Sequence, residues 1–318
     1  MNIKSFLKLV EIQTKVASII PFLLGTAYVI YRFDSFIGKN FILMLISLLS
    51  IDMATTAINN YQDFKKAIKK EGYGYESHNA IVSHNLNERS VKITIAILLL
   101  SASVFGFWLF IETNIIVLGL GMVSFLLGVS YSYGPIPISR TPFGELFSGL
   151  FMGGVITFLA VYINLPDAAL LGLSYNNFIL DIKVNVEELV FIALLTLPAI
   201  AGIANIMLAN NICDMHDDLE NMRCTLPIYV GKEKALIIYK SLYYAGFLSI
   251  AVLITIGVLP IICAISLISI IPVQKNINLF YKSQLKNKTF ATAVNNFAFV
   301  NIALILSIGA GIIIKTRL

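Results

Sequence analysis

Charged residues are scarce in this chain of 318 residues. Asp, Glu, Lys and Arg make up only 13% of it, whereas hydrophobic residues make up 58% and the mean hydropathy is +0.83. Soluble domains carry about 25% charged residues. The composition therefore excludes an ordinary soluble domain and predicts a polytopic membrane protein.

Cysteine and histidine are also rare, with three residues of each. Cys213, Cys224 and Cys263 are odd in number and have no Cys-x-x-Cys spacing, which argues against a disulfide framework and a zinc site. The basic residues form no stripe with interleaved aromatic residues, so the net charge of +5 does not indicate nucleic-acid binding. The first residues lack the pattern of a cleaved signal peptide, so we expect the first apolar run to be retained.

Long apolar runs dominate the rest of the sequence. A membrane-spanning helix needs about 20 apolar residues, and nine runs qualify: 17–31, 41–62, 93–111, 114–133, 145–163, 189–212, 236–257, 258–273 and 295–314. Gly257 and Pro260 separate the seventh run from the eighth with almost no loop. The sequence thus predicts an all-α integral membrane protein of about nine helices, organised as a single domain over residues 1–318.

The basic residues predict the orientation of these helices, because short cytoplasmic loops carry most of the Lys and Arg. With a cytoplasmic N-terminus and nine spans, most of the 23 Lys and Arg residues fall on the cytoplasmic side. We therefore expect a multi-pass protein of the cytoplasmic membrane, in contact with lipid, whose polar helix ends face the cytoplasm.

One short sequence motif occurs twice, each time at the polar end of an apolar run. The pattern is Asn-Asn-x-x-Asp, first at Asn59, Asn60 and Asp63, and then at Asn210, Asn211 and Asp214, with Asp218 one helical turn further on. Residues four apart share one face of a helix. Carboxylate and amide oxygens suit Mg²⁺, which proteins usually hold with one or two carboxylates and substrate phosphates. The repeat predicts a paired magnesium site, and two unrelated polar helix ends are the alternative.

Other polar groups in apolar surroundings are functional candidates because they are costly in a membrane. Asp52 lies two helical turns before Asn59. A place in the site and a structural partnership with a Thr or Lys of a neighbouring helix are both open for it. Gly149 and Gly153 form a Gly-x-x-x-Gly pair, which packs helices either within the bundle or between subunits.

The chemistry that needs acidic helix ends in an apolar bundle is displacement of diphosphate from a lipid. Mg²⁺ and basic side chains stabilise the negative charge that develops on the leaving group. The allylic cation left behind needs shielding from water, which an apolar space between helices provides.

The sequence resembles the UbiA superfamily of intramembrane aromatic prenyltransferases, and within it the 1,4-dihydroxy-2-naphthoate polyprenyltransferases. The resemblance covers nearly the whole chain: the stretch at 15–28, both Asn-Asn-x-x-Asp motifs, Arg223 and Thr225, and the stretch at 131–150. The first motif departs from the family pattern, since Asn60 replaces the usual Asp and a further Asp after Asp63 is missing. We expect weaker metal binding there unless Asp52, Glu71 or Glu76 compensates.

The resemblance implies helices around a central cavity and Mg²⁺-dependent transfer of a polyprenyl group to 1,4-dihydroxy-2-naphthoate, with loss of the ring carboxylate. Asn59, Asn60, Asp63, Asn210, Asn211, Asp214 and Asp218 would hold the metal. Lys65, Arg140 and Arg223 would bind the polyprenyl diphosphate, and Tyr131, Glu145 and Lys15 would position the aromatic acceptor or take its proton. Lys15 alternatively ends the first span by snorkelling to the membrane surface.

Three other functions fit parts of the pattern. A UbiA-type enzyme for another acceptor, such as 4-hydroxybenzoate, shares every motif. A secondary transporter also carries intramembrane Asp and Asn, but its polar groups lie near mid-membrane. An inactive membrane scaffold is suggested by the altered first motif.

Overall fold

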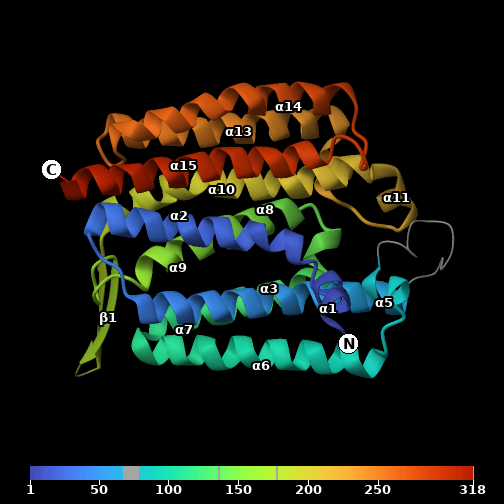
Figure 1. Cartoon of the computed structure of the whole chain (residues 1–318), viewed down its shortest axis with the longest axis horizontal. Helices are drawn as coiled ribbons and strands as arrows, with labels where there is room; N and C mark the ends of the chain where they lie inside the picture. Colours follow the sequence, from blue (N-terminus) through green and yellow to red (C-terminus); the bar gives the residue numbers. More distant parts are fainter. Residues whose placement is uncertain (67–78, 135–136, 177, 318) are drawn as a thin grey trace. The chain divides into compact units, whose positions relative to one another are not determined.

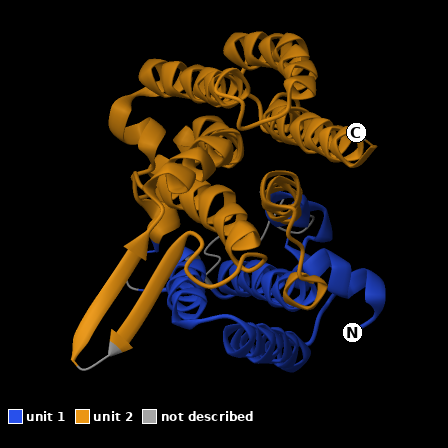
Figure 2. Cartoon of the chain, turned by 90° about the vertical axis from the view of Figure 1, so that its left-hand side faces the viewer, with its two compact units in different colours: residues 1–18, 42–137 blue, residues 19–41, 138–318 orange. Residues whose placement is uncertain are grey.

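The computed structural model describes residues 1–66, 79–134, 137–176 and 178–317, and almost all of them are helical (Figure 1). They form two compact units, which Figure 2 colours separately. Unit 1 comprises residues 1–18 and 42–137, and unit 2 comprises residues 19–41 and 138–318.

Unit 1 is built mainly from long apolar helices that follow a short N-terminal helix. Its elements are α1 (Ile3–Leu9), η1 (Ile12–Lys15), the start of α2 (Val16–Phe33), most of α3 (Gly38–Lys66), α5 (Ala80–Ser83), α6 (Glu88–Glu112) and α7 (Ile115–Ser132). Leu9 of α1 packs with Ala57 of α3 and Val91 of α6 in a buried cluster. This cluster anchors the N-terminal helix against the polar end of α3.

Unit 2 contains the remaining spans and one small sheet. Its elements are most of α2, η2 (Ile138–Arg140), α8 (Gly144–Ser148), η3 (Gly149–Val155), α9 (Ile156–Tyr162), β1 (Leu171–Asn176), β2 (Ile179–Val184), α10 (Val186–Cys213), α11 (Met215–Glu220), α12 (Leu226–Val230), α13 (Lys232–Thr255), η4 (Ile261–Ser269), α14 (Ile270–Lys282) and α15 (Ala291–Arg317). α10 packs against α8, η3, α13 and α15, so it is the central helix of this unit.

The predicted spans agree with the helices. In the described part of the chain, eight helices are long and apolar enough to cross a membrane, and Ile115–Tyr131 is a shorter ninth. The break between the seventh and eighth spans is also confirmed. Gly257 has a positive φ of 75°, which glycine adopts without strain, and Pro260 caps η4. The all-α membrane fold is thus confirmed, whereas a single domain with a central cavity stays a prediction.

Small residues allow α10 to approach its neighbours closely. A Cβ atom added to Gly153 would lie 2.5 Å from the Ile200 nitrogen, and one added to Gly149 would lie 2.9 Å from the Ile200 carbonyl oxygen. The Gly-x-x-x-Gly pair therefore packs helices within the chain, as small residues commonly do in membrane proteins.

We expect Gly153→Ala to destabilise the protein by about 1–3 kcal/mol, because the added methyl group would force the two backbones apart. Gly121→Ala is the matched control, since a Cβ atom there meets nothing within 4 Å. Unfolding of the two variants in detergent measures the difference. Equal stability of both would contradict the close packing of Gly153.

Candidate functional site

The first motif occupies the last turns of α3. Asn59 is half-buried, and its Oδ1 atom is buried without a hydrogen-bond partner among the described residues. Asp63 is exposed one turn further on. A buried amide oxygen that no donor satisfies is costly unless a ligand or water uses it. These two side chains therefore offer two oxygens of the kind that Mg²⁺ binds.

Asn60 has a different environment, in contact with the N-terminal segment. It is 7% exposed, and its Nδ2 atom donates hydrogen bonds to the Leu9 carbonyl at 2.9 Å and to Glu11 Oε1 at 3.2 Å. An aspartate at this position would have no N–H to donate. The departure from the family pattern thus has a structural reason, and Glu11, which sequence reasoning missed, places a carboxylate beside the first motif.

Asp52 has a structural partnership. Lys15 Nζ donates to Asp52 Oδ1 at 2.6 Å, to the Asp52 carbonyl at 3.1 Å and to Thr56 Oγ1 at 2.7 Å. Ser18 Oγ donates to the second oxygen of Asp52 at 2.5 Å. The three N–H groups of Lys15 are satisfied in the interior, so this side chain does not snorkel. Both carboxylate oxygens of Asp52 are engaged by Lys15 and Ser18, so Asp52 does not supply the negative charge that Asn60 lacks. Glu71 and Glu76, the other two candidates for that charge, lie outside the described residues.

The second motif lies at a break between two helices. α10 ends at Cys213, and Asp214 caps its C-terminus before α11 begins. The sequence placed Asp218 one helical turn beyond Asp214, and the structure interrupts the helix at Asp214 itself. The spacing of one turn is nevertheless retained, because the Asp218 N–H donates to the Asp214 carbonyl at 2.8 Å.

Asp218 is held by two donors from the segment that follows α11. It is 4% exposed, with Arg223 Nη1 at 3.4 Å from one carboxylate oxygen and Thr225 Oγ1 at 3.4 Å from the other. Burial raises the pKa of Asp218, and the Arg223 charge opposes part of that rise. The Arg223 Nε atom is buried without a partner among the described residues, so its guanidinium has an unused donor beside the motif.

A lysine far away in the sequence contacts the second motif. Lys286, in the segment between α14 and α15, forms an ion pair with the Asp214 carboxylate. The lysine side chain is 52% exposed and that of Asp214 is 24% exposed. Sequence reasoning placed Lys286 on the same membrane side but missed it as a site residue. The sequence could not predict this contact because Lys286 lies 72 positions from Asp214.

Glu145 joins the second motif from α8. It is 3% exposed, and its Oε1 atom accepts a hydrogen bond from Asn211 Nδ2 at 2.8 Å, whereas Oε2 has no partner among the described residues. Asn210 Nδ2 lies 3.5 Å from Asn211 Oδ1. The structure thus brings together Glu145 and the two asparagines that the sequence predicted for the site.

The other predicted residues have less specific surroundings. Lys65 is exposed and pairs with Glu88 at 2.8 Å, and Tyr131 is half-buried near the end of α7. Arg140 is exposed, but its carbonyl accepts a hydrogen bond from the Cys224 N–H at 3.1 Å, which places η2 beside the segment of Arg223. Among the described residues, no three His, Cys, Asp or Glu side chains are close enough to hold a metal together.

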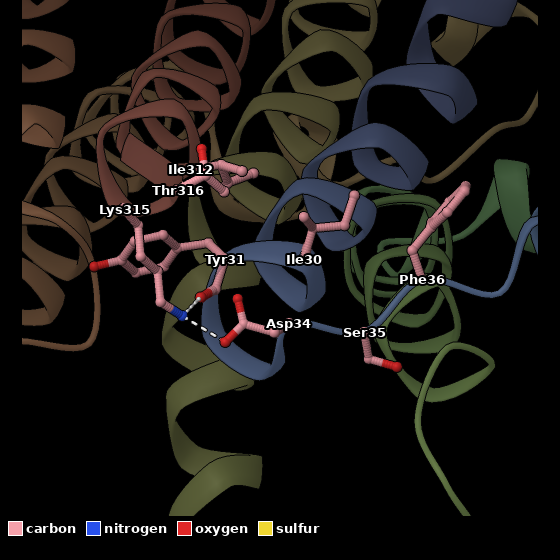
Figure 3. A pocket seen from close by; sticks show the side chains of 8 residues that line it. All are labelled: Ile30, Tyr31, Asp34, Ser35, Phe36, Ile312, Lys315 and Thr316. Atoms are coloured by element: carbon pink, nitrogen blue, oxygen red, sulfur yellow. Dashed lines mark hydrogen bonds and ion pairs between the residues drawn. The ribbon is translucent and has the colours of Figure 1, made fainter. Parts of the chain in front are cut away.

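A small pocket lies between the C-terminal ends of α2 and α15 (Figure 3), and Figure 1 shows that α15 ends on the opposite side of unit 2 from α11. It has a volume of about 140 Å³, and Lys315 closes one side by donating to Asp34 at 2.7 Å and to the Tyr31 carbonyl at 3.1 Å. None of the predicted site residues lines it. We do not assign it to the site.

Comparisons with known proteins agree with the motifs and the fold. The chain is 29% identical to the 1,4-dihydroxy-2-naphthoate octaprenyltransferase of Bacillus subtilis (strain 168) over 254 residues, which cover 77% of this chain and 72% of that protein. A UbiA homologue from Archaeoglobus fulgidus bound to DMAPP and Mg²⁺ has 15% identity and a TM-score of 0.65. The match covers 97% of this chain and 99% of the homologue.

A second solved structure shows the same fold. The apo UbiA homologue from Aeropyrum pernix K1 has 17% identity and a TM-score of 0.63, with 93% of this chain and 98% of that chain covered. The model of the UbiA prenyltransferase family matches residues 18–304, which are most of the chain. The protein therefore belongs to the UbiA prenyltransferase family.

Proposed function

We propose that the protein transfers a polyprenyl group from an allylic diphosphate to 1,4-dihydroxy-2-naphthoate, with loss of the ring carboxylate to give demethylmenaquinone. The observation that carries this proposal is the 29% identity to the naphthoate octaprenyltransferase across 77% of the chain. The surroundings of the second motif support the general reaction, since acidic, basic and amide groups converge there at a helix end.

The residues present fit a magnesium ion in each motif. Asn59 and Asp63 would bind it in the first motif. Asn210, Asn211, Asp214 and Asp218 would do so in the second. The Oδ1 atom of Asn59, which has no hydrogen-bond partner among the residues that the structure describes, supports this assignment, as does the oxygen-rich donor set. When bound, the metal neutralises the diphosphate and so favours its departure.

Arg223 is the basic residue best placed to bind the diphosphate. Its Nε–H has no partner in the described part of the chain, and its planar guanidinium suits a phosphate oxygen, which Arg commonly binds through two parallel hydrogen bonds. Arg140 lies on the neighbouring segment and would add a second positive charge. Lys65 would take part only after its ion pair with Glu88 opens.

Glu145 is proposed to accept a proton from the aromatic acceptor. Its Oε1 atom accepts a hydrogen bond from Asn211, whereas its Oε2 atom has no partner among the described residues. A buried carboxylate with one free oxygen is suited to hydrogen bonding with a phenolic hydroxyl. Tyr131 is a second candidate for positioning the aromatic acceptor. Lys15 would do so only after releasing the Asp52 carboxylate, to which it is bound.

The experiment that tests the proposed function uses the full chain purified in detergent. We would assay transfer from a long allylic diphosphate to 1,4-dihydroxy-2-naphthoate and, separately, to 4-hydroxybenzoate, with and without Mg²⁺. Mg²⁺-dependent demethylmenaquinone is the expected product. Product from 4-hydroxybenzoate alone would overturn the acceptor but keep prenyl transfer, and no product from either would count against the whole proposal.

The proposal includes the orientation of the protein. The second motif is close to Lys286, Arg223 and Arg140, and such basic residues favour the cytoplasmic side of a membrane. We therefore place the motif ends of the helices at the cytoplasmic face of the cytoplasmic membrane.

Removing Lys286 is expected to strengthen metal binding. The ammonium group of Lys286 neutralises Asp214, so a cation and the lysine would compete for one carboxylate. Exposed ion pairs contribute up to about 1 kcal/mol, so Lys286→Met should raise the affinity for Mg²⁺ by about two- to fivefold. Calorimetric titration of Mg²⁺ into the detergent-solubilised protein measures the change.

Lys288→Met is the matched control, because Lys288 is exposed in the same segment and has the same charge. Equal Mg²⁺ affinities for the two variants would show that Lys286 does not compete for Asp214.

A further inference from the structure

A β-hairpin interrupts the helical chain between α9 and α10. β1 and β2 pair in antiparallel fashion, with Leu171 opposite Val184 at the base and Asn176 opposite Ile179 near the tip. The hairpin contains the only strands among the described residues. Its place at the end of two membrane spans, away from both motifs in the sequence, gives it no part in the proposed reaction.

The register of the hairpin separates apolar from polar side chains. Residues directly opposite each other in an antiparallel pair point to the same face, and side chains alternate along each strand. Three apolar pairs therefore share one face: Leu171 with Val184, Leu173 with Ile182, and Tyr175 with Leu180. The other face carries Gly172 with Lys183, Ser174 with Asp181 and Asn176 with Ile179. The hairpin is therefore amphipathic from its base to the pair of Tyr175 and Leu180, and Ile179 near the tip is an apolar residue on the polar face.

The apolar face is uncovered in the described chain. Apart from the half-buried Leu171, its members are exposed: Leu173 by 46%, Tyr175 by 65%, Leu180 by 57%, Ile182 by 62% and Val184 by 48%. Phe178, close to the tip, is 95% exposed. Soluble surfaces rarely keep so many neighbouring apolar side chains in water. The face therefore belongs against another apolar surface.

Hydrogen bonds fix the base of the hairpin to the ends of the adjacent spans. The Asn185 N–H donates to the Leu170 carbonyl at 2.8 Å, and Asn185 also caps α10. Tyr162, the last residue of α9, donates through its hydroxyl to the Leu171 carbonyl at 3.0 Å. The hairpin thus begins beside the C-terminal end of α9 and the N-terminal end of α10.

The direction of the strands places the hairpin along the membrane surface. In Figure 1 the strands run across the axes of α10 and α15, and in Figure 2 they project sideways from the helices of unit 2. Helices that span a membrane run across it, so strands perpendicular to them run parallel to its plane. Exposed apolar residues also follow the hairpin into the first turns of α10, with Val186 exposed by 65% and Val190 by 50%.

We infer that the hairpin docks on the lipid bilayer, with its apolar face in the boundary between headgroups and acyl chains. The leaflet is the one at the N-terminal end of α10, opposite to the second motif. Unpaired backbone groups at the open strand edges keep the hairpin out of the hydrocarbon core. Tyr175 and Phe178 are of the residue types that favour this boundary, and Asp181 and Lys183 face the polar side.

Tryptophan fluorescence tests the depth of each face. Trp108 is the only tryptophan in the chain, so Trp108→Phe gives a background without signal. Into it we would introduce Leu173→Trp, Leu180→Trp or Ile182→Trp on the apolar face. Ser174→Trp and Asp181→Trp on the polar face are the matched controls. The full chain would be reconstituted at one copy per nanodisc, with brominated acyl chains or aqueous iodide as the quencher.

We expect the brominated lipid to quench the apolar-face variants at least twofold more strongly than the controls, and iodide to show the reverse order. Equal access of iodide to both faces would overturn the inference. Protection of the apolar face only in discs that hold two copies would also overturn it, and would assign the face to a second copy of the chain. Five variants on an exposed hairpin keep the test independent of the folding of any one of them.

Discussion

Asp214→Asn is expected to lower prenyl transfer by about 10³-fold, the size of effect seen when a group that stabilises developing charge is removed. Asp214 stands at the junction of α10 and α11, where its carboxylate is partly exposed and neutralised by Lys286. Asparagine keeps the shape and one oxygen but removes the charge that a cation requires. The assay is product formation from a long allylic diphosphate at saturating Mg²⁺, together with Mg²⁺ titration by calorimetry.

Asp217→Asn supplies the control for this prediction. Asp217 lies in α11, three residues after Asp214, and is outside the motif. The same loss of one charge should leave transfer within about twofold of the unmodified protein, because surface substitutions away from specific sites have small effects. Full activity of Asp214→Asn, or an equal loss in both variants, would remove the second motif from the proposed metal site.

Lys15→Met is expected to destabilise the folded protein by about 3–5 kcal/mol, because it leaves the Asp52 carboxylate buried without its positive partner. The side chains of the pair are 2% and 13% exposed, so water does little to screen the lost charge. Denaturant or thermal unfolding in detergent measures the change. The carboxylate would keep only the hydroxyl of Ser18 as a side-chain donor.

The double variant Lys15→Met with Asp52→Asn should recover most of this loss, because removing both charges of a buried pair is often nearly neutral. Lys4→Met is the matched control, since Lys4 is exposed in α1. If Lys15→Met unfolds like Lys4→Met, the buried ion pair does not stabilise unit 1.

The helices could be predicted from the sequence because the lipid bilayer sets both their length and their composition. Each of the nine predicted runs coincides with a helix, including the short one at Ile115–Tyr131. The break at Gly257 and Pro260 was predictable because the chemistry of those two residues is local. A lysine partner for Asp52 was among the alternatives that the sequence left open, and Lys15 is that partner. Thr56 lies on the same helix as Asp52, and the contact with Ser18 was not predicted.

The remaining features depend on contacts that no local pattern reports. Lys286 and Glu11 join the motifs from segments 72 and 49 positions away, and neither belongs to a periodic pattern that would single it out. The hairpin was missed for a different reason. Its strands have six residues each, and their alternation becomes informative only when the register pairs Leu173 with Ile182.

The hydrogen bonds of Asn60 limit how the first motif can be altered. Asn60→Asp would restore the usual acidic residue of the family, but it would place a carboxylate against the Leu9 carbonyl and beside Glu11. Oxygen would then face oxygen where an N–H now donates, and the added negative charge would repel Glu11. We therefore expect Asn60→Asp to be tolerated only with a compensating change in the N-terminal segment, because residues 9–11 and residue 60 share these hydrogen bonds.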